Sequence, residues 1–186
     1  MSRVIVIEFM SLDGVMQDPD GNEGTPHGGW AFRFGPGPVT GDPFGLSGIL
    51  DTGALLLGRQ TWQMFAKIWP GRDDPFSAKL NAMPKLVVSR SLDQATDWQN
   101  SALLPGDLVT EVRKRKQEQD IVITGSASVV RTLMAHDLVD EYRLIVFPLV
   151  IGEGTRVFPD GTAPVNLALT SAQTTGPAVR LIYTRA

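Results

Sequence analysis

The chain contains no cysteine and only two histidines, His27 and His136, so the residue types that most often bind transition metals are nearly absent. Disulfide bonds, thiolate metal sites and cysteine nucleophiles are therefore excluded, and a site built from several histidines is not expected. We predict no metal site. The absence of cysteine also fits a reducing compartment without requiring one.

The sequence also lacks long apolar runs and a dominant sign of charge. No apolar run approaches the roughly 18 residues of a membrane-spanning helix, and no basic and apolar leader precedes the strand-like run at Val4. The 17 basic and 20 acidic residues give a formal net charge of −3, which favours neither nucleic acid nor an anionic membrane as partner. We expect a soluble cytoplasmic protein that acts on a small molecule.

Apolar segments of strand and helix period alternate along the chain, which is most simply one domain over residues 1–186. Two tail segments flank T-T-G-P and predict an antiparallel hairpin. Helices on both faces of a mostly parallel sheet, with this hairpin at its edge, make an α/β three-layer sandwich. The expected strands are 4–9, 55–57, 85–89, 121–124, 141–146, 165–172 and 179–184, and the expected helices are 44–51, 61–68, 76–82, 108–117 and 126–134.

Two turns pass from an apolar strand through a glycine directly into a helix. The first is A-L-L-L-G-R-Q-T-W at 54–62, where Arg59 and Thr61 place a cation and a hydroxyl beside Gly58. The second is I-V-I-T-G-S-A-S at 121–128, which runs through Gly125. Backbone N–H groups at a helix N-terminus bind phosphate well, so two such turns predict a phosphate-rich cofactor.

Two further segments follow expected strands. Ser89-Arg90 comes after the strand at 85–89, and S-L-D-G at 11–14 comes after the first strand. Ligands of α/β sheets bind outside the carboxyl ends of the strands, so we expect these segments and both glycine turns to converge on one cleft. The Gly- and Pro-rich segment 17–42 is longer than most loops and is expected to be functional.

The motifs G-R-Q-T-W at 58–62, V-V-S-R at 87–90 and T-G-S-A at 124–127 resemble the cofactor framework of the dihydrofolate reductase superfamily. E-F-M-S-L-D-G-V at 8–15 and L-V-D-E-Y-R-L, F-P-L-V-I-G-E-G and V-F-P between 138 and 159 resemble a narrower group. These motifs are similar to stand-alone relatives of the reductase domain at the C-terminus of the bifunctional riboflavin-pathway deaminase-reductase. The resemblance covers nearly the whole chain in order. The zinc deaminase half cannot be present without cysteine.

This resemblance implies a dihydrofolate reductase-like fold, NADPH as cofactor and, because the relatives are commonly dimers, a homodimer. The implied reaction reduces the ribose of a ribosylaminopyrimidine phosphate to ribitol. Reductases often carry two consecutive glycines at the second turn, whereas here Thr124 precedes a single Gly125. Ser89 and Arg90 would meet the adenosine 2′-phosphate, and the two glycine turns would meet the pyrophosphate. The implied cofactor residues are Gly58, Arg59, Thr61, Ser89, Arg90, Gly125, Ser126, Ala127 and Ser128.

Two aspartates are candidates for catalysis. Asp42 either binds a pterin-like ring, as an acidic residue at a similar place does in folate reductases, or caps a helix with Pro43 at its first position. Asp13 lies in the S-L-D-G turn, which is expected beside the nicotinamide. Phe9 and Trp30 are our candidates for substrate contact, and Trp30 could instead anchor the loop. Two alternatives remain beside the riboflavin-pathway reductase: a pterin or dihydrofolate reductase, and an NADP-binding module without turnover.

Overall fold

The computed structural model describes residues 2–186, which divide into two compact units. Unit 1 comprises the residues up to Val6 together with Gly45–Asp140, and unit 2 comprises Ile7–Phe44 together with Glu141–Ala186. The first strand, β1 (Val4–Ser11), begins in unit 1 and ends in unit 2. The prediction of a single domain over 1–186 stays a prediction.

The strands of unit 1 lie in the order β4-β3-β2-β5-β1, and every neighbouring pair is parallel. Leu55, Leu56 and Leu57 are at most 1% exposed, as expected for a parallel strand covered on both faces. Leu56 pairs with Ile123, and Gly58 pairs with Val88. These pairings bring the carboxyl ends of neighbouring strands to the same edge. Besides β1, the strands are β2 (Ala54–Gly58), β3 (Lys85–Val88), β4 (Ser101–Leu103) and β5 (Ile121–Ile123).

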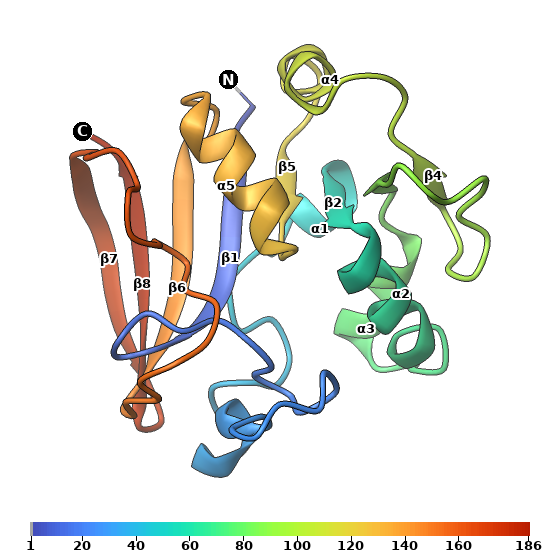
Figure 1. Cartoon of the computed structure of the whole chain (residues 1–186). Helices are drawn as coiled ribbons and strands as arrows, with labels where there is room; N and C mark the ends of the chain where they lie inside the picture. The colour runs from blue at the N-terminus through green and yellow to red at the C-terminus, as the bar shows by residue number, and fades with distance from the viewer. Residues whose placement is uncertain (1) are drawn as a thin grey trace. The chain divides into compact units, whose positions relative to one another are not determined.

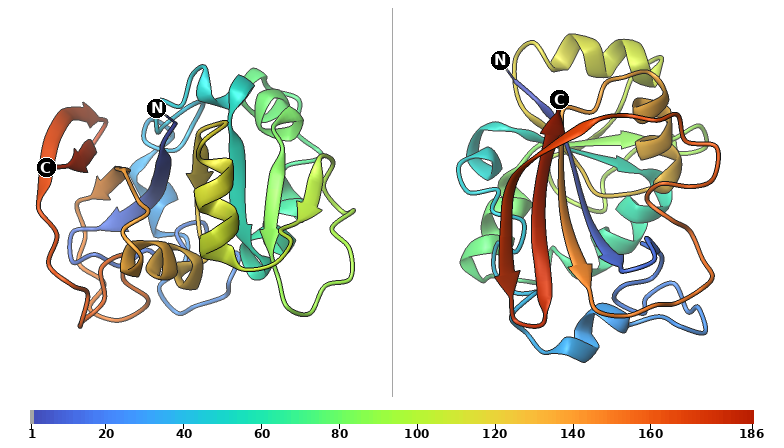
Figure 2. Two further views of the ribbon diagram at one scale, coloured as in Figure 1. Left: turned by 90° about the horizontal axis from the view of Figure 1, so that it is seen from above. Right: turned by 90° about the vertical axis from the view of Figure 1, so that its left-hand side faces the viewer.

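The helices of unit 1 lie on both sides of its strands. In the left view of Figure 2, α1 and α3 lie on one side and α5 lies on the other. Amphipathic sequences explain this packing: α5 buries Val129, Val130 and Leu133 while Arg131 stays exposed. The helices are α1 (Ile49–Thr52), α2 (Arg59–Ile68), α3 (Pro75–Ala82), α4 (Leu108–Arg115) and α5 (Ala127–Ala135).

Unit 2 contains an antiparallel group of strands in the order β6-β8-β7, which stand side by side in Figure 1. The strands are β6 (Glu141–Phe147), β7 (Leu167–Thr175) and β8 (Ala178–Arg185). The last two form the C-terminal hairpin, with a register irregularity between Leu169 and Ser171. The predicted fold class, a mostly parallel sheet with a C-terminal antiparallel hairpin, is confirmed.

Two details of the predicted elements are wrong. The helix expected over 44–51 is only α1, whose N-cap is Gly48, so Asp42 does not cap it and Pro43 is not its first residue. A run of turns precedes this helix because Gly45, Ser47 and Gly48 interrupt the apolar pattern there. Strand β4 was not expected, since its sequence S-A-L contains none of the β-branched or aromatic residues that mark β5.

The long segment 17–42 is ordered around one buried carboxylate. Asp18 is 0% exposed, and its two carboxylate oxygens accept hydrogen bonds from the backbone of Glu23 and from the backbone and hydroxyl of Thr25. Gly28 packs directly against it, because a Cβ there would come 2.2 Å from Asp18 Oδ2. The segment then enters the 3-10 helix η1 (Trp30–Phe34), which starts with a fully buried tryptophan.

Candidate functional site

The two glycine turns of unit 1 lie against each other at the carboxyl ends of β2 and β5. The Gly58 N–H donates to the Gly125 carbonyl at 3.4 Å. A Cβ at Gly58 would come 1.9 Å from Ser126 Oγ, so only glycine fits there. Gly125 has φ +65, and a Cβ on it would come 2.8 Å from Thr61 Oγ1. The structure therefore brings Gly58, Thr61, Gly125 and Ser126 together, and their predicted role in cofactor binding stays a prediction.

Helices α2 and α5 begin at these turns, at the N-caps Gly58 and Ser126. Within residues 2–186, no side chain caps either helix start, since Gly58 has no side chain and Ser126 Oγ accepts no hydrogen bond from α5. The first backbone N–H groups of a helix have no partner inside the helix, and the helix dipole makes this end positive. Ala127 and Ser128 form the first turn of α5, where Ser126 Oγ and Ser128 Oγ lie 3.4 Å apart. Both helix starts are suited to bind an anion.

Charged and hydroxyl groups stand beside these helix starts. Arg59 is half-buried, and its guanidinium donates to Gln63 Oε1 at 3.2 Å one turn along α2. Ser89 and Arg90 follow Val88, the residue that pairs with Gly58. Ser89 Oγ accepts the N–H groups of Ser91 and Leu92 and so shapes the turn, while Arg90 is exposed. An exposed guanidinium next to a glycine turn can reach a phosphate from solvent.

The Asp13 turn belongs to unit 2. The carboxylate of Asp13 accepts hydrogen bonds from Ser11 Oγ at 2.7 Å, Ile151 N at 3.1 Å and Gly152 N at 2.8 Å. These bonds, led by the one from Ser11, outweigh the effect of burial and lower the pKa of Asp13 to about 2. Asp13 is therefore ionised at neutral pH and bound to the backbone of a distant segment. Its predicted role in catalysis stays a prediction.

Phe9 and Trp30 share an aromatic cluster in unit 2. Both rings contact Phe147, with centroid distances of 5.7 Å and 5.4 Å, and Phe9 also contacts Phe44 at 5.0 Å. Trp30 is 0% exposed and donates its indole N–H to the Gln17 carbonyl at 2.8 Å. This burial supports the anchoring role of Trp30, and its contact with substrate stays a prediction. Phe9 is half-buried, and its contact with substrate stays a prediction.

Asp42 lies at a bend seven positions before the first residue of α1, Ile49. The next two residues are held by side chains of β8 and β6, since Arg180 donates to the Pro43 carbonyl and Arg143 donates to the Phe44 carbonyl. Asp42 therefore lies in the irregular end of the long segment and not in a helix.

Sequence reasoning missed three side chains that order unit 2, namely Ser11, Asp18 and Arg156. The turn signature D-P-D-G at 18–21 was a signal for the second of these.

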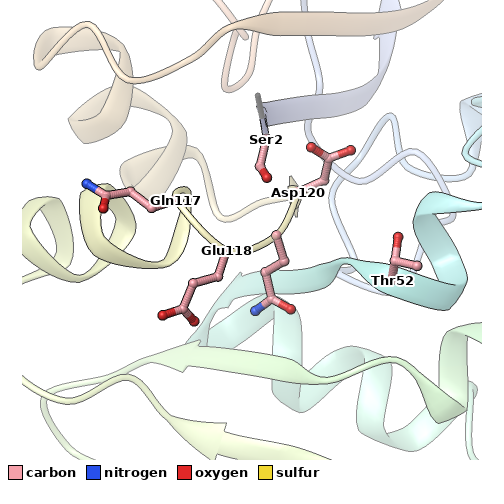
Figure 3. A pocket seen from close by; sticks show the side chains of 6 residues that line it. Ser2, Thr52, Gln117, Glu118 and Asp120 are labelled. Atoms are coloured by element: carbon pink, nitrogen blue, oxygen red, sulfur yellow. The ribbon is translucent and has the colours of Figure 1, made fainter.

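A polar pocket lies elsewhere in unit 1, at the amino ends of its strands (Figure 3). Asp120 immediately precedes β5, whereas the Gly125 turn follows that strand. The Asp120 carboxylate already accepts the backbone N–H of Arg3 at 2.7 Å. This pocket is thus separate from the glycine turns. Its lining residues are Ser2, Thr52, Gln117, Glu118, Gln119 and Asp120.

Residues 2–186 include no helix that is both long enough and apolar enough to cross a membrane. In the same part of the chain, no three His, Asp or Glu side chains gather closely enough to hold a metal ion.

Comparisons with known proteins identify the family and the fold of this chain. The protein YyaP of Bacillus subtilis (strain 168), described as uncharacterized, is 30% identical over 192 residues, covering 97% of this chain and 94% of YyaP. A solved structure from Shewanella sp. PV-4, named for riboflavin biosynthesis, matches with a TM-score of 0.76 and 21% identity over 99% of both chains.

A pyrimidine reductase-like protein of Corynebacterium diphtheriae matches with a TM-score of 0.61 and 12% identity, covering 100% of this chain and 92% of that one. At such identities these two structures establish the fold alone. The family model described as the RibD C-terminal domain matches residues 2–181. The chain belongs to the RibD C-terminal domain family, with a dihydrofolate reductase-like fold.

Proposed function

We propose that this protein is an NADPH-dependent reductase that acts on a ribosylaminopyrimidine or a similar small heterocycle. The observation that carries the proposal is the pair of interlocked glycine turns, from which two helices start without a side-chain cap. Two adjacent positive helix ends match the two phosphates of a dinucleotide. Membership of the RibD C-terminal domain family supports a reductase.

The residues present fit this cofactor. Gly58 and Gly125 leave no room for side chains between the turns, so the backbone itself faces an approaching ligand. Arg59, Thr61 and the first turn of α5, Ser126 to Ser128, would hold the pyrophosphate. Ser89 and Arg90 would bind the 2′-phosphate, which NADH lacks. NADPH would supply a hydride, and the protein would bind and orient the two reactants.

The substrate class rests on the relatives. One structural relative is named for riboflavin biosynthesis and another as pyrimidine reductase-like, and the family takes its description from RibD. The proposed reaction therefore resembles the 5-amino-6-(5-phosphoribosylamino)uracil reductase step. In this proposal Asp13 and Phe9 of unit 2 are the candidates for catalysis and substrate contact, while Trp30 holds the long segment in place. Asp42 remains a candidate for ring binding only if it faces a ligand.

The test combines binding with turnover. NADPH and NADH are titrated against the protein by fluorescence, and NADPH absorbance is then followed with ribosylaminopyrimidine phosphates, pterins and dihydrofolate. We expect tighter binding of NADPH and oxidation only with the pyrimidine ribosides. Oxidation with pterins alone would favour the pterin or dihydrofolate reductase. Binding without oxidation by any acceptor would favour an NADP-binding module, and absence of NADPH binding would reject the proposal.

We also propose a cytoplasmic homodimer, as the resemblance implies. Light scattering coupled to size-exclusion chromatography measures the mass in solution directly. A mass of twice 20.2 kDa is expected. A monomer over the micromolar range would contradict the proposal.

A further inference from the structure

Two segments of unit 2 that are far apart in the sequence run side by side. Leu12 N donates to the Leu149 carbonyl at 2.8 Å, Met16 N to the Thr155 carbonyl at 2.9 Å, and Val157 N to the Gly14 carbonyl at 3.0 Å. The turn 11–16 begins at the last residue of β1, and the segment 149–157 follows β6. Both segments are irregular, so side chains must supply the bonds that a regular strand ladder would provide.

Asp13 stands at the centre of this junction and bonds across it. One carboxylate oxygen accepts from Ile151 N and Ser11 Oγ, and the other accepts from Gly152 N. Three donors therefore bind the two carboxylate oxygens of Asp13. Ser11 is 0% exposed and its hydroxyl oxygen also accepts the Val15 N–H at 2.9 Å, so the turn that carries Asp13 is itself held.

Arg156 reinforces the same junction from the other segment. Its Nε donates to the Asp13 carbonyl at 3.2 Å, and its Nη2 donates to the Gly152 carbonyl at 3.3 Å. The guanidinium also lies 4.0 Å from Asp13 Oδ2. We call this arrangement of Ser11, Asp13, Ile151, Gly152 and Arg156 the Asp13 clamp.

We propose that Asp13 is a positioning residue, which fixes the segment 149–157 against the turn after β1 and supplies no proton to the substrate. The inference rests on the proposed reductase function, because ligands of α/β sheets bind where such turns follow the strands. An ionised carboxylate can only accept hydrogen bonds. The Asp13 carboxylate accepts them from two backbone N–H groups and one hydroxyl. The lowered pKa of about 2 agrees, since the clamp is complete above about pH 4 and opens only as the pH falls towards 2.

The decisive variant is Asp13→Asn, compared with Asp160→Asn, which makes the same change at an exposed residue of unit 2. Amide hydrogen exchange is measured in the segment 149–157 and, as an internal reference, in α5. In Asp13→Asn we expect exchange at Ile151 and Gly152 to be at least about tenfold faster, because an amide group replaces one of the two acceptor oxygens. Asp160→Asn should match the wild-type protein in both regions.

Turnover separates positioning from proton transfer. With the acceptor found in the panel, kcat/KM of Asp13→Asn should fall about tenfold or more while its pH profile keeps the wild-type shape. A proton donor would instead lose one limb of the profile with unchanged exchange at Ile151 and Gly152. That result, or unchanged exchange together with unchanged turnover, would overturn the inference.

Measurements on the wild-type protein and on a second variant, Ser11→Ala, test the clamp even if Asp13→Asn does not fold. Carbon NMR of the wild-type side chain should show Asp13 titrating below about pH 3, and a pKa of 4 or higher would contradict the clamp. If Asp13→Asn does not fold, Ser11→Ala removes one donor and should raise both this pKa and the exchange at Ile151 and Gly152. If no acceptor is ever reduced, the proposed function fails, whereas exchange and titration still decide whether the clamp exists.

Discussion

Three helices of unit 1 start after parallel strands, yet they start in two different ways. Helix α4 follows β4, and its N-cap Asp107 accepts the Thr110 N–H at 2.9 Å with its own carboxylate. Helices α2 and α5 follow β2 and β5 and have no such bond at Gly58 or Ser126. The Asp107 carboxylate satisfies a backbone N–H at the start of α4, whereas the starts of α2 and α5 keep N–H groups that a bound anion can satisfy.

This difference separates helix starts that serve stability from helix starts that are suited to a ligand. The capping bonds from Thr110 lower the pKa of Asp107, as expected for a carboxylate held at a helix N-terminus. At Gly58 and Ser126, a tight contact between the two turns takes the place of a cap. The comparison therefore predicts that changes at α2 and α5 affect cofactor binding, and that changes at α4 affect stability.

The largest effect is expected from Gly125→Val. The valine would adopt φ +65 and press against Thr61, at a cost in folding stability of about 1 to 3 kcal/mol, and it would fill the approach to the turn. NADPH affinity should fall below detection and the Tm should drop. Gly71→Val is the control, because a Cβ at Gly71 meets nothing within 4 Å. Retained NADPH affinity in a folded variant would make this turn only structural.

The next largest effect is expected from Ser128→Asp, which places an acidic residue in the first turn of α5, two positions after its N-cap Ser126. The carboxylate would stabilise the helix start by about 0.3 to 1 kcal/mol and repel a bound pyrophosphate. NADPH affinity, measured by calorimetry, should fall about a hundredfold at low salt while the Tm stays level or rises. Ser128→Asn has nearly the same shape without the charge and should bind almost normally. Equal affinities of the two variants would place the phosphates elsewhere.

Arg90→Ala extends the comparison to the end of β3. Loss of a charge-assisted contact with the 2′-phosphate corresponds to about 1.5 to 3 kcal/mol, or roughly tenfold to a hundredfold in NADPH affinity. NADH binding should hardly change, so the ratio of the two dissociation constants is the measurement. Arg113→Ala, at an exposed arginine of α4, is the control. If the unmodified protein binds both cofactors equally, Arg90 does not belong to the site.

Asp107→Ala tests the other side of the comparison. Loss of this cap should lower the Tm by about 2 to 4 °C and leave NADPH affinity unchanged. Asp107→Asn should restore most of the stability, because asparagine caps about as well as aspartate. A loss of NADPH affinity in Asp107→Ala without a change in Tm would contradict the proposed difference between the capped start of α4 and the uncapped starts of α2 and α5.

The smallest effect is expected from Asp42→Asn. Because the N-cap of α1 is Gly48, Asp42 does not cap that helix, and asparagine keeps the size of the side chain, so the Tm should stay within about 1 °C of wild type. Turnover on the accepted substrate should stay within about twofold. A large loss of kcat/KM with intact NADPH binding would favour the pterin or dihydrofolate reductase instead.

Most elements of the fold could be predicted because their signals are local. The leucines of β2 and the isoleucines of β5 form apolar runs, and the glycines at their ends mark the turns into helices. The predicted strands and helices outside α1 and β4 agree with the structure to within three residues at each end. The Asp42 cap failed because the surrounding glycines and Ser47 favour turns over a continuous helix.

The sequence by itself determined the alternation of strands and helices, both glycine turns and the family, since each depends on residues close together along the chain. Only the tertiary structure decided which groups meet across the turns. Thr61 lies against Gly125, and Asp13 bonds to Ile151 and Gly152, 138 and 139 positions away. No local pattern encodes such partners, because they depend on strand pairing and on how irregular segments satisfy their backbone hydrogen bonds.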